Sequence, residues 1–258
     1  MAKKVKVGAH VSHDTPLESA ARLDIEAIQI FNGKPQGWQK PPPRADAEEL
    51  RDSPLDLYIH APYLINVCSP KPNVRYGSRK ILSQQCEAAA ELGAKALIVH
   101  PGYAEDGIEE GVGRWSRTLE MLESEIPVYL ENTAGGDNAV ARRVDALGKL
   151  WEAVESADDG VEVGFCFDTC HAHAAGEDLT DVVERMRAVT GRIDLCHAND
   201  SRDPPGTGAD RHANLGAGQI DPEDLRAMIR ACEAPVLVET PGRGHPADLE
   251  FVRQALAE

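Results

Sequence analysis

The sequence predicts an α/β fold, specifically a (β/α)8 barrel that forms one domain over residues 1–258. The first observation is that eight short apolar runs alternate with amphipathic stretches along the chain. Such alternation is typical of parallel strands joined by helical crossovers. The second is size, because 258 residues suit a single barrel and 42% hydrophobic residues can fill its core. No linker, low-complexity segment or other repeat divides the chain.

The eight apolar runs predict the barrel strands. Most are uninterrupted, as expected for strands that are buried on both faces. In chain order they cover residues 4–10, 27–31, 55–62, 94–102, 127–135, 161–171, 192–200 and 234–242.

The stretches between these runs predict helices. Several end in glycine or shortly before proline, which are helix-stop signals. The clearest cover residues 79–93, 113–125, 138–156 and 221–233. Two segments that contain proline and glycine, 32–48 after the second strand and 199–221 after the seventh, are predicted as long loops.

The balance of charge is strongly acidic, with a formal net charge of −16 from 43 Asp and Glu against 27 Lys and Arg. Taken alone, this argues against a nucleic-acid partner, because such proteins usually present a basic surface. An alternative explanation is adaptation to a very salty cytoplasm, where screening lengths fall to about 3 Å. Both explanations stay open at this point.

The sequence also bears on the compartment. No apolar run is long enough for a membrane span, so no membrane association is expected. The first residues lack the apolar stretch of a signal peptide, which favours the cytoplasm. The six cysteines are accordingly expected to be free thiols.

Histidines and carboxylates end most of the predicted strands. Each one alone is more often a satisfied polar residue or a helix cap than a metal ligand. As a set they should converge, because all strands of such a barrel open on one face at their carboxyl ends. With an Asp-x-His pair from the loop 199–221, the set is His10, His60, His100, Glu131, Asp168, His171, His197, Asp210, His212 and Glu239.

Burying so many ionisable groups together is costly unless they are paired or bind metal. Mixed imidazole and carboxylate ligands suit zinc, manganese or iron, whereas Mg²⁺ favours oxygen alone. The pattern therefore predicts a multinuclear metal site. Four histidines are less informative. His10 is expected to point into the pocket, His13 and His245 to be solvated, and His173 to pack or to support the ligands.

Six motifs give the chain a resemblance to a known family. They read HAPYLIN, VHPG, LENTAGG, GFCFDTCHAHAAG, LCHANDS and DRHANLGAG, in that order. With them the chain resembles the endonuclease IV family of apurinic/apyrimidinic endonucleases, zinc enzymes of base-excision repair. The resemblance implies a monomer that hydrolyses the phosphodiester bond 5′ to an abasic site in double-stranded DNA. The products would be a 3′-hydroxyl and a 5′-deoxyribose phosphate.

The resemblance also implies three divalent metals per chain, with zinc as the first expectation and manganese as an alternative at one site. His60 and His100 would bind the first metal, and Glu131 would bridge it to the second. Asp168, His197 and Glu239 would complete the second site, and His171, Asp210 and His212 would hold the third. The carboxylates of Glu131, Asp168 and Glu239 are the expected catalytic groups. His10 would line the pocket without binding metal.

Contacts to DNA are expected from three loops, which follow the second, third and seventh predicted strands. Tyr63 and Leu64 match family residues that fill the gap in the duplex. The family loop after the second strand usually presents an Arg shortly before a Trp, whereas here Gln36 and Gly37 precede Trp38. The expected DNA contacts are Lys34, Gln36, Trp38, Tyr63, Leu64 and Arg211.

The alternative is a divalent-metal sugar isomerase or epimerase on the same barrel. Such enzymes also place Glu, Asp and His at strand ends, around one or two metals. They need fewer ligands and have little use for the DRHANLG segment. A non-catalytic protein that binds damaged DNA or metal is a third interpretation, which a cleavage assay would decide.

Overall fold

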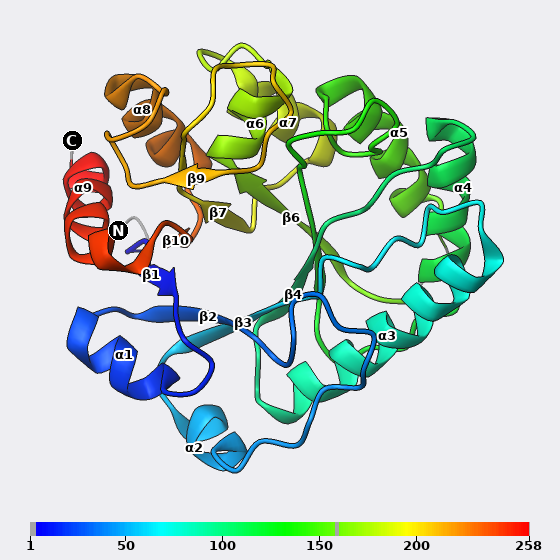
Figure 1. Cartoon of the computed structure of the whole chain (residues 1–258), viewed down its shortest axis with the longest axis horizontal. Coiled ribbons are helices and arrows are strands. Elements are labelled where there is room, and N and C mark those ends of the chain that lie inside the picture. Colours follow the sequence, from blue (N-terminus) through cyan, green and yellow to red (C-terminus); the bar gives the residue numbers. More distant parts are fainter. Residues whose placement is uncertain (1–3, 158–159, 258) are drawn as a thin grey trace.

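Eight parallel strands form a closed barrel that is surrounded by helices (Figure 1). The computed structural model describes residues 4–157 and 160–257. Around the barrel the strand order is β1-β10-β7-β6-β5-β4-β3-β2. The barrel strands are β1 (Val7–His10), β2 (Ala27–Phe31), β3 (Asp56–His60), β4 (Ala96–Val99), β5 (Val128–Glu131), β6 (Val163–Asp168), β7 (Leu195–His197) and β10 (Val236–Val238). The predicted (β/α)8 fold is confirmed.

The helices lie outside the strands, as Figure 1 shows. They are α1 (Pro16–Leu23), α2 (Ala47–Asp52), α3 (Pro72–Glu91), α4 (Ile108–Leu119), α5 (Val144–Glu155), α6 (Thr169–Ala175), α7 (Val182–Thr190), α8 (Pro222–Cys232) and α9 (His245–Ala257), with a 3₁₀ turn η1 (Gly242–Gly244) before α9. Within the described residues, no helix is long and apolar enough to cross a membrane.

Helix α8 shows how the sequence sets these elements. The Asp221 side chain accepts a hydrogen bond from the Glu223 backbone N–H, and Pro222 occupies the first helical position, where no N–H is needed. The residues that face the barrel recur at helical spacing and are Leu225, Met228, Ile229 and Cys232. The helix ends where Glu233 adopts the left-handed conformation, with φ of 52°.

Alternation along the strands divides the core into two layers. On β2, Ile28 and Ile30 join the main core, whereas Ala27 belongs to a separate cluster of residues from other strands. This second cluster fills the inside of the barrel. Gln29 lies on the same side of β2 as Ala27, so its side chain reaches the carboxyl-end opening of the barrel.

Several predicted elements differ from the structure in their bounds. The sixth strand stops at Asp168 rather than residue 171, because Asp168 caps α6 by accepting the His171 N–H at 2.7 Å. Helix α5 begins at Val144 instead of residue 138, because residues before it bond to a neighbouring loop, as in the Val140 N–H to Gly102 carbonyl contact. The helices predicted from residues 79 and 113 begin earlier, at residues 72 and 108.

The loop 199–221 is also more ordered than predicted. It contains two short antiparallel strands, β8 (Asp200–Ser201) and β9 (His212–Ala213). The six cysteines are all buried and free, as predicted.

Candidate metal centre

The carboxyl ends of six barrel strands bring the predicted ligands together. His60, Glu131, Asp168 and His197 are the last residues of β3, β5, β6 and β7. His100 and Glu239 directly follow β4 and β10. Because Asp168 and His197 are partners in the β6–β7 register, their side chains start from the same level of the barrel. All nine predicted ligands fall into three adjoining groups, and within each group the donor atoms lie within 4.8 Å of one another.

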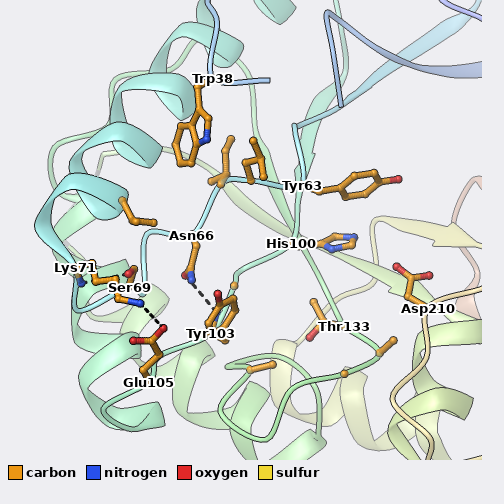
Figure 2. A pocket seen from close by; sticks show the side chains of 17 residues that line it. Trp38, Tyr63, Asn66, Ser69, Lys71, His100, Tyr103, Glu105, Thr133 and Asp210 are labelled. Atoms are coloured by element: carbon orange, nitrogen blue, oxygen red, sulfur yellow. Dashed lines mark hydrogen bonds and ion pairs between the residues drawn. The ribbon is translucent and has the colours of Figure 1, made fainter. Parts of the chain in front are cut away.

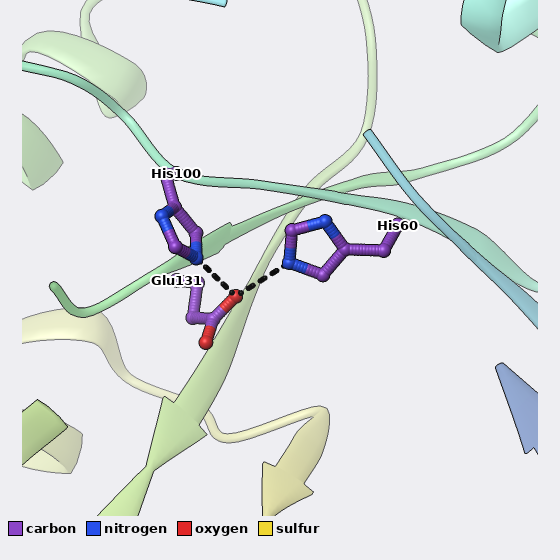
Figure 3. Close-up of side chains that lie close together, drawn as sticks. All are labelled: His60, His100 and Glu131. Atoms are coloured by element: carbon purple, nitrogen blue, oxygen red, sulfur yellow. Dashed lines mark ion pairs between the residues drawn. The ribbon is translucent and has the colours of Figure 1, made fainter. Parts of the chain in front are cut away.

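The first group consists of His60, His100 and Glu131 (Figure 3). The Nε2 atoms of both histidines lie 3.3 Å from Glu131 Oε2. His60 Nδ1 is 2.7 Å from the Ala61 carbonyl oxygen, which can only accept, so Nδ1 carries the hydrogen. The Nε2 lone pair of His60 therefore faces a buried carboxylate oxygen. Two acceptors at this distance need a proton or a metal cation between them.

The second group consists of Glu131, Asp168, His197 and Glu239. His197 Nδ1 lies 3.2 Å from both Glu131 Oε1 and Glu239 Oε2. His197 Nε2 donates to the Gln29 side-chain oxygen at 2.8 Å, which leaves the Nδ1 lone pair directed at the two carboxylates. Glu131 belongs to both this group and the first, so it is placed to bridge them.

The third group consists of His171, Asp210 and His212. The two imidazole Nε2 atoms lie 3.2 and 3.1 Å from Asp210 Oδ1. His171 Nδ1 donates to the Asn132 carbonyl oxygen at 2.8 Å, so its Nε2 lone pair faces Asp210. This group adjoins the second through a 3.9 Å contact between His212 Nε2 and Asp168 Oδ2.

The donor atoms fit divalent metal. Zinc binds imidazole and carboxylate at about 2.0–2.2 Å, so two ligands on one tetrahedral zinc lie roughly 3.3–3.5 Å apart. The nitrogen–oxygen separations of 3.1–3.3 Å in the three groups are close to this value. Among the described residues, the buried atoms Glu131 Oε2, His171 Nε2 and His212 Nε2 have no hydrogen-bond partner, as expected of atoms that bind a cation.

Charge coupling in the groups is strong. Burial alone would lower the pKa of His212, but the carboxylates of Asp210 and Asp168 raise it to about 9. Burial opposes ionisation of Glu131 as well, yet His197 and His100, when protonated, hold its pKa well below the usual range. The Glu131 carboxylate therefore stays ionised, which is the form in which a carboxylate can bind a cation.

Comparison with known proteins shows the family to which the chain belongs. A family described as xylose isomerase-like TIM barrels matches residues 17–256. The probable endonuclease 4 of Mycobacterium marinum is 53% identical over 252 residues, which cover 97% of this chain and 98% of that protein. The chain belongs to the endonuclease IV family.

Solved structures share the fold of this endonuclease IV family member. Endonuclease IV from Thermus thermophilus superposes with a TM-score of 0.81 at 29% identity, and the match covers 98% of this chain and 99% of that one. A D-tagatose 3-epimerase-like protein reaches a TM-score of 0.78 at 20% identity, with 98% and 97% of the two chains covered. The second match shows a shared barrel alone.

Three buried amides hold the predicted ligands and were not predicted from the sequence. Asn132 bonds to both backbone polar groups of Asp168, at 3.0 and 2.7 Å. Asn199 donates to Asp168 Oδ2 at 2.7 Å and accepts from the Glu239 N–H at 2.9 Å. Gln29 bonds to both His197 and Glu239. Two of these amides follow predicted ligands closely in sequence, which is the one signal that could have indicated them.

The other histidines are divided between pocket and core. His10 lies 3.6 Å from Glu239 Oε1 and lines a cavity next to the one over the predicted ligands. His13 is exposed. The prediction that His245 is solvated is wrong: it is buried, and its Nε2 contacts the Thr240 carbonyl oxygen at 2.9 Å because the chain turns back through η1. His173 is buried against the Asp203 carbonyl oxygen at 3.0 Å.

Two cysteines also approach the ligands. Cys166 lies near Glu131 and His197, and Cys170 near Asp168 and His212. Burial raises the pKa of each thiol to about 12, so both stay protonated at neutral pH. The three groups contain their histidine and carboxylate donors without either thiol.

The predicted DNA contacts separate into two sets. Trp38, Tyr63 and Leu64 line a single cavity beside the metal centre. The Tyr63 ring lies 5.3 Å from that of His60 and 5.5 Å from that of His100, between centroids. Lys34 and Gln36 lie on the loop that follows β2 and do not line this cavity. Arg211 forms a two-point ion pair with Asp203.

Proposed function

We propose that this protein is a DNA-repair hydrolase that cleaves the phosphodiester bond 5′ to an abasic site in double-stranded DNA. The observation that carries the proposal is the set of three adjoining His–carboxylate groups with Glu131 common to two of them. Identity of 53% to a probable endonuclease 4 over nearly the whole chain supports the substrate class. We further propose that the protein acts as a monomer in the cytoplasm.

Each of the three groups would hold one metal ion. His60, His100 and Glu131 would hold one ion, and Glu131 with Asp168, His197 and Glu239 would hold a second. His171, Asp210 and His212 would hold the third. Zinc is the proposed metal, with manganese compatible at one site, because both accept mixed imidazole and carboxylate ligands.

In the proposed reaction, the oxygen of a water molecule forms a bond to phosphorus and the bond from phosphorus to the 3′-oxygen of the preceding nucleotide breaks. The departing 3′-oxygen takes up a proton, which leaves a 3′-hydroxyl and a 5′-deoxyribose phosphate. When bound, divalent cations would activate the water and stabilise charge on the phosphate oxygens. The chain has no need of a Ser–His or Cys–His nucleophile.

The protein's own residues fix the geometry of this reaction. Glu131 is fully buried, with Oε2 towards His60 and His100 and Oε1 towards His197, so it would hold a cation in each of the first two groups. Asp168 commits Oδ1 to the α6 cap and directs Oδ2 towards Asn199 and the centre. Tyr63 covers the histidine side of the centre, where its exposed ring can contact DNA. An abasic sugar can reach this centre cheaply, because it has no base to unstack.

The test is incision of an end-labelled duplex with one abasic site, followed by DNA polymerase extension. Extension of the nicked strand is expected, because the proposed cleavage leaves a 3′-hydroxyl. A nicked strand that cannot be extended would contradict the cleavage position. For the alternative sugar isomerase, one or two metals per chain and no incision are expected.

A further inference from the structure

The cavity lined by Trp38, Tyr63 and Leu64 borders the metal centre at His100 and Asp210, and the proposed hydrolysis gives no role to its far side. It measures about 400 Å³, within the range of small-molecule sites. We call it the aromatic pocket, because Trp38, Tyr63 and Tyr103 line it together with Asn66 and Thr133. Figure 2 shows Trp38 at one end of the pocket, and Tyr103 with Thr133 at the other.

The aromatic rings of this pocket are unusually accessible. Trp38, Tyr63 and Tyr103 are 46%, 49% and 51% exposed, and they are three of the five large exposed hydrophobic residues among those described. They come from three separate loops, after β2, β3 and β4. Flat rings gathered from separate loops provide stacking surfaces for a planar ligand.

Polar groups in the pocket are placed for a neutral ligand. Thr133 is only 8% exposed, and its hydroxyl oxygen has no hydrogen-bond partner among the described residues. Lys71 and Glu105, which also line the pocket, neutralise each other at 2.8 Å. With this cation already paired, the pocket suits an uncharged group with hydrogen-bonding edges better than a phosphate.

The pocket wall is built rigidly. The Asn66 backbone N–H donates to Ser78 Oγ at 2.8 Å, and Asn66 Oδ1 accepts from the Tyr103 N–H at 3.2 Å. Gly102 has a φ of +85°, and a Cβ there would lie 2.4 Å from Asn66 Oδ1. Only glycine therefore lets the chain pass close enough to Asn66 for that residue to orient Tyr103.

We propose that the aromatic pocket binds a nucleobase that leaves the DNA stack when an abasic site enters the metal centre. This inference rests on the proposed function. Tyr63, His100 and Asp210 line both the pocket and the cavity over the metal centre, so one stretch of DNA can occupy both. Stacking needs no phosphate contact, which suits a chain with a net charge of −16 that lacks the expected loop arginine.

Steady-state incision with four duplexes tests the proposal. The parent carries one tetrahydrofuran abasic site; each of the other three also lacks the base of the 5′ neighbour, the 3′ neighbour or the opposite nucleotide. A sequencing gel follows incision at the original site alone. In the wild type, removing the captured base is expected to raise KM by about 5- to 150-fold with little change in kcat.

Variants test whether the pocket causes this rise in KM, which is called the missing-base penalty below. Tyr103→Ala should raise KM for the parent duplex and lose the additional penalty for the missing base. Thr133→Val, which keeps the side-chain shape, should raise KM only when that base is present. Tyr76→Ala is the matched control, since Tyr76 is 59% exposed but lies outside the pocket, and it should behave as the wild type. An unchanged penalty in Tyr103→Ala, or no penalty in the wild type, overturns the inference.

A readout without incision separates this inference from the proposed function. Free deoxyadenosine at millimolar concentration should quench the fluorescence of Trp38 in the wild type and in Tyr76→Ala. Trp38→Phe identifies the signal, and Tyr103→Ala should weaken it. Absence of quenching overturns the nucleobase pocket even if the abasic duplex is cleaved. Quenching without any incision supports the pocket and contradicts the hydrolase.

Discussion

At the scale of single residues, Glu131 lies at the middle of the metal centre. Its two oxygens lie 3.2–3.3 Å from nitrogens of four histidines, His60, His100, His171 and His197. The neighbouring carbonyl and amide oxygens fix which imidazole nitrogen carries hydrogen, so lone pairs converge on carboxylates. The placement of hydrogens, as much as residue type, therefore defines the site.

Glu131→Gln is expected to keep the fold and lose cleavage by on the order of 100-fold or more, because an amide cannot offer two anionic oxygens to two cations. Turnover and metal content of the same preparation provide the measurement. Glu177→Gln is the control, since the Glu177 side chain is only 8% exposed but pairs with Arg185 away from the centre. Near-wild-type turnover with full metal content would rule out the bridging role.

At the scale of elements, the loop 199–221 presents two of the predicted ligands. Asp200, fully buried, accepts hydrogen bonds from the backbone N–H groups of Ser201, Gly216, Gly218 and Ile220, at 2.7–3.1 Å. These bonds close the loop around the β8–β9 pair that carries His212. Asp248 accepts further hydrogen bonds from the Leu215 N–H and the Asn214 side chain, so buried carboxylates order much of this loop.

Asp200→Ala should destabilise the protein by roughly 3 kcal/mol, because it leaves buried N–H groups without an acceptor. It should also remove one metal of the three, since the loop holds Asp210 and His212. Urea unfolding of the metal-free protein and metal analysis of the loaded protein measure the two effects. Asp137→Ala, at a fully exposed site, should change neither. Unchanged metal content in Asp200→Ala would contradict the role of the loop.

The elements differ in how well sequence predicts them. Six strand ends and their side chains can be located, because uninterrupted apolar runs mark buried strands and parallel strands open on one face. The start of helix α6 is predicted as strand, because the periodicity of a short apolar run does not distinguish strand from helix. The Asp168 cap is what ends the strand. Gln29, Asn132 and Asn199 are not predicted, because uncharged amides become informative only once register brings them to the ligands.

At the scale of the whole molecule, the chain has 43 acidic residues against 27 basic ones. This balance is the feature least expected of a DNA enzyme. Several exposed cations are already engaged by carboxylates, as in the pairs Lys40–Glu87, Lys71–Glu105 and Arg211–Asp203. Phosphate contacts through surface cations are therefore expected to be few. The metal centre and the aromatic pocket would supply contacts that salt screens much less.

Salt dependence follows from this charge. Cleavage of abasic DNA is expected to rise with KCl to an optimum on the order of 1 M or above, because cations screen repulsion within the protein and between protein and DNA. The measurement runs from dilute buffer to multimolar KCl, with circular dichroism at each point to separate folding from binding. A maximum near about 0.1 M with a stable fold would contradict adaptation to salt.

If three adjoining metal sites hydrolyse abasic DNA, incision must depend on the metals that they hold. The most direct measurement combines metal analysis with incision of an abasic duplex, before and after a chelator and after zinc is restored. We expect about three divalent metals per chain, loss of incision as they are removed, and recovery with zinc. Incision that persists in the metal-free protein, or no incision by protein loaded with three metals, would contradict it.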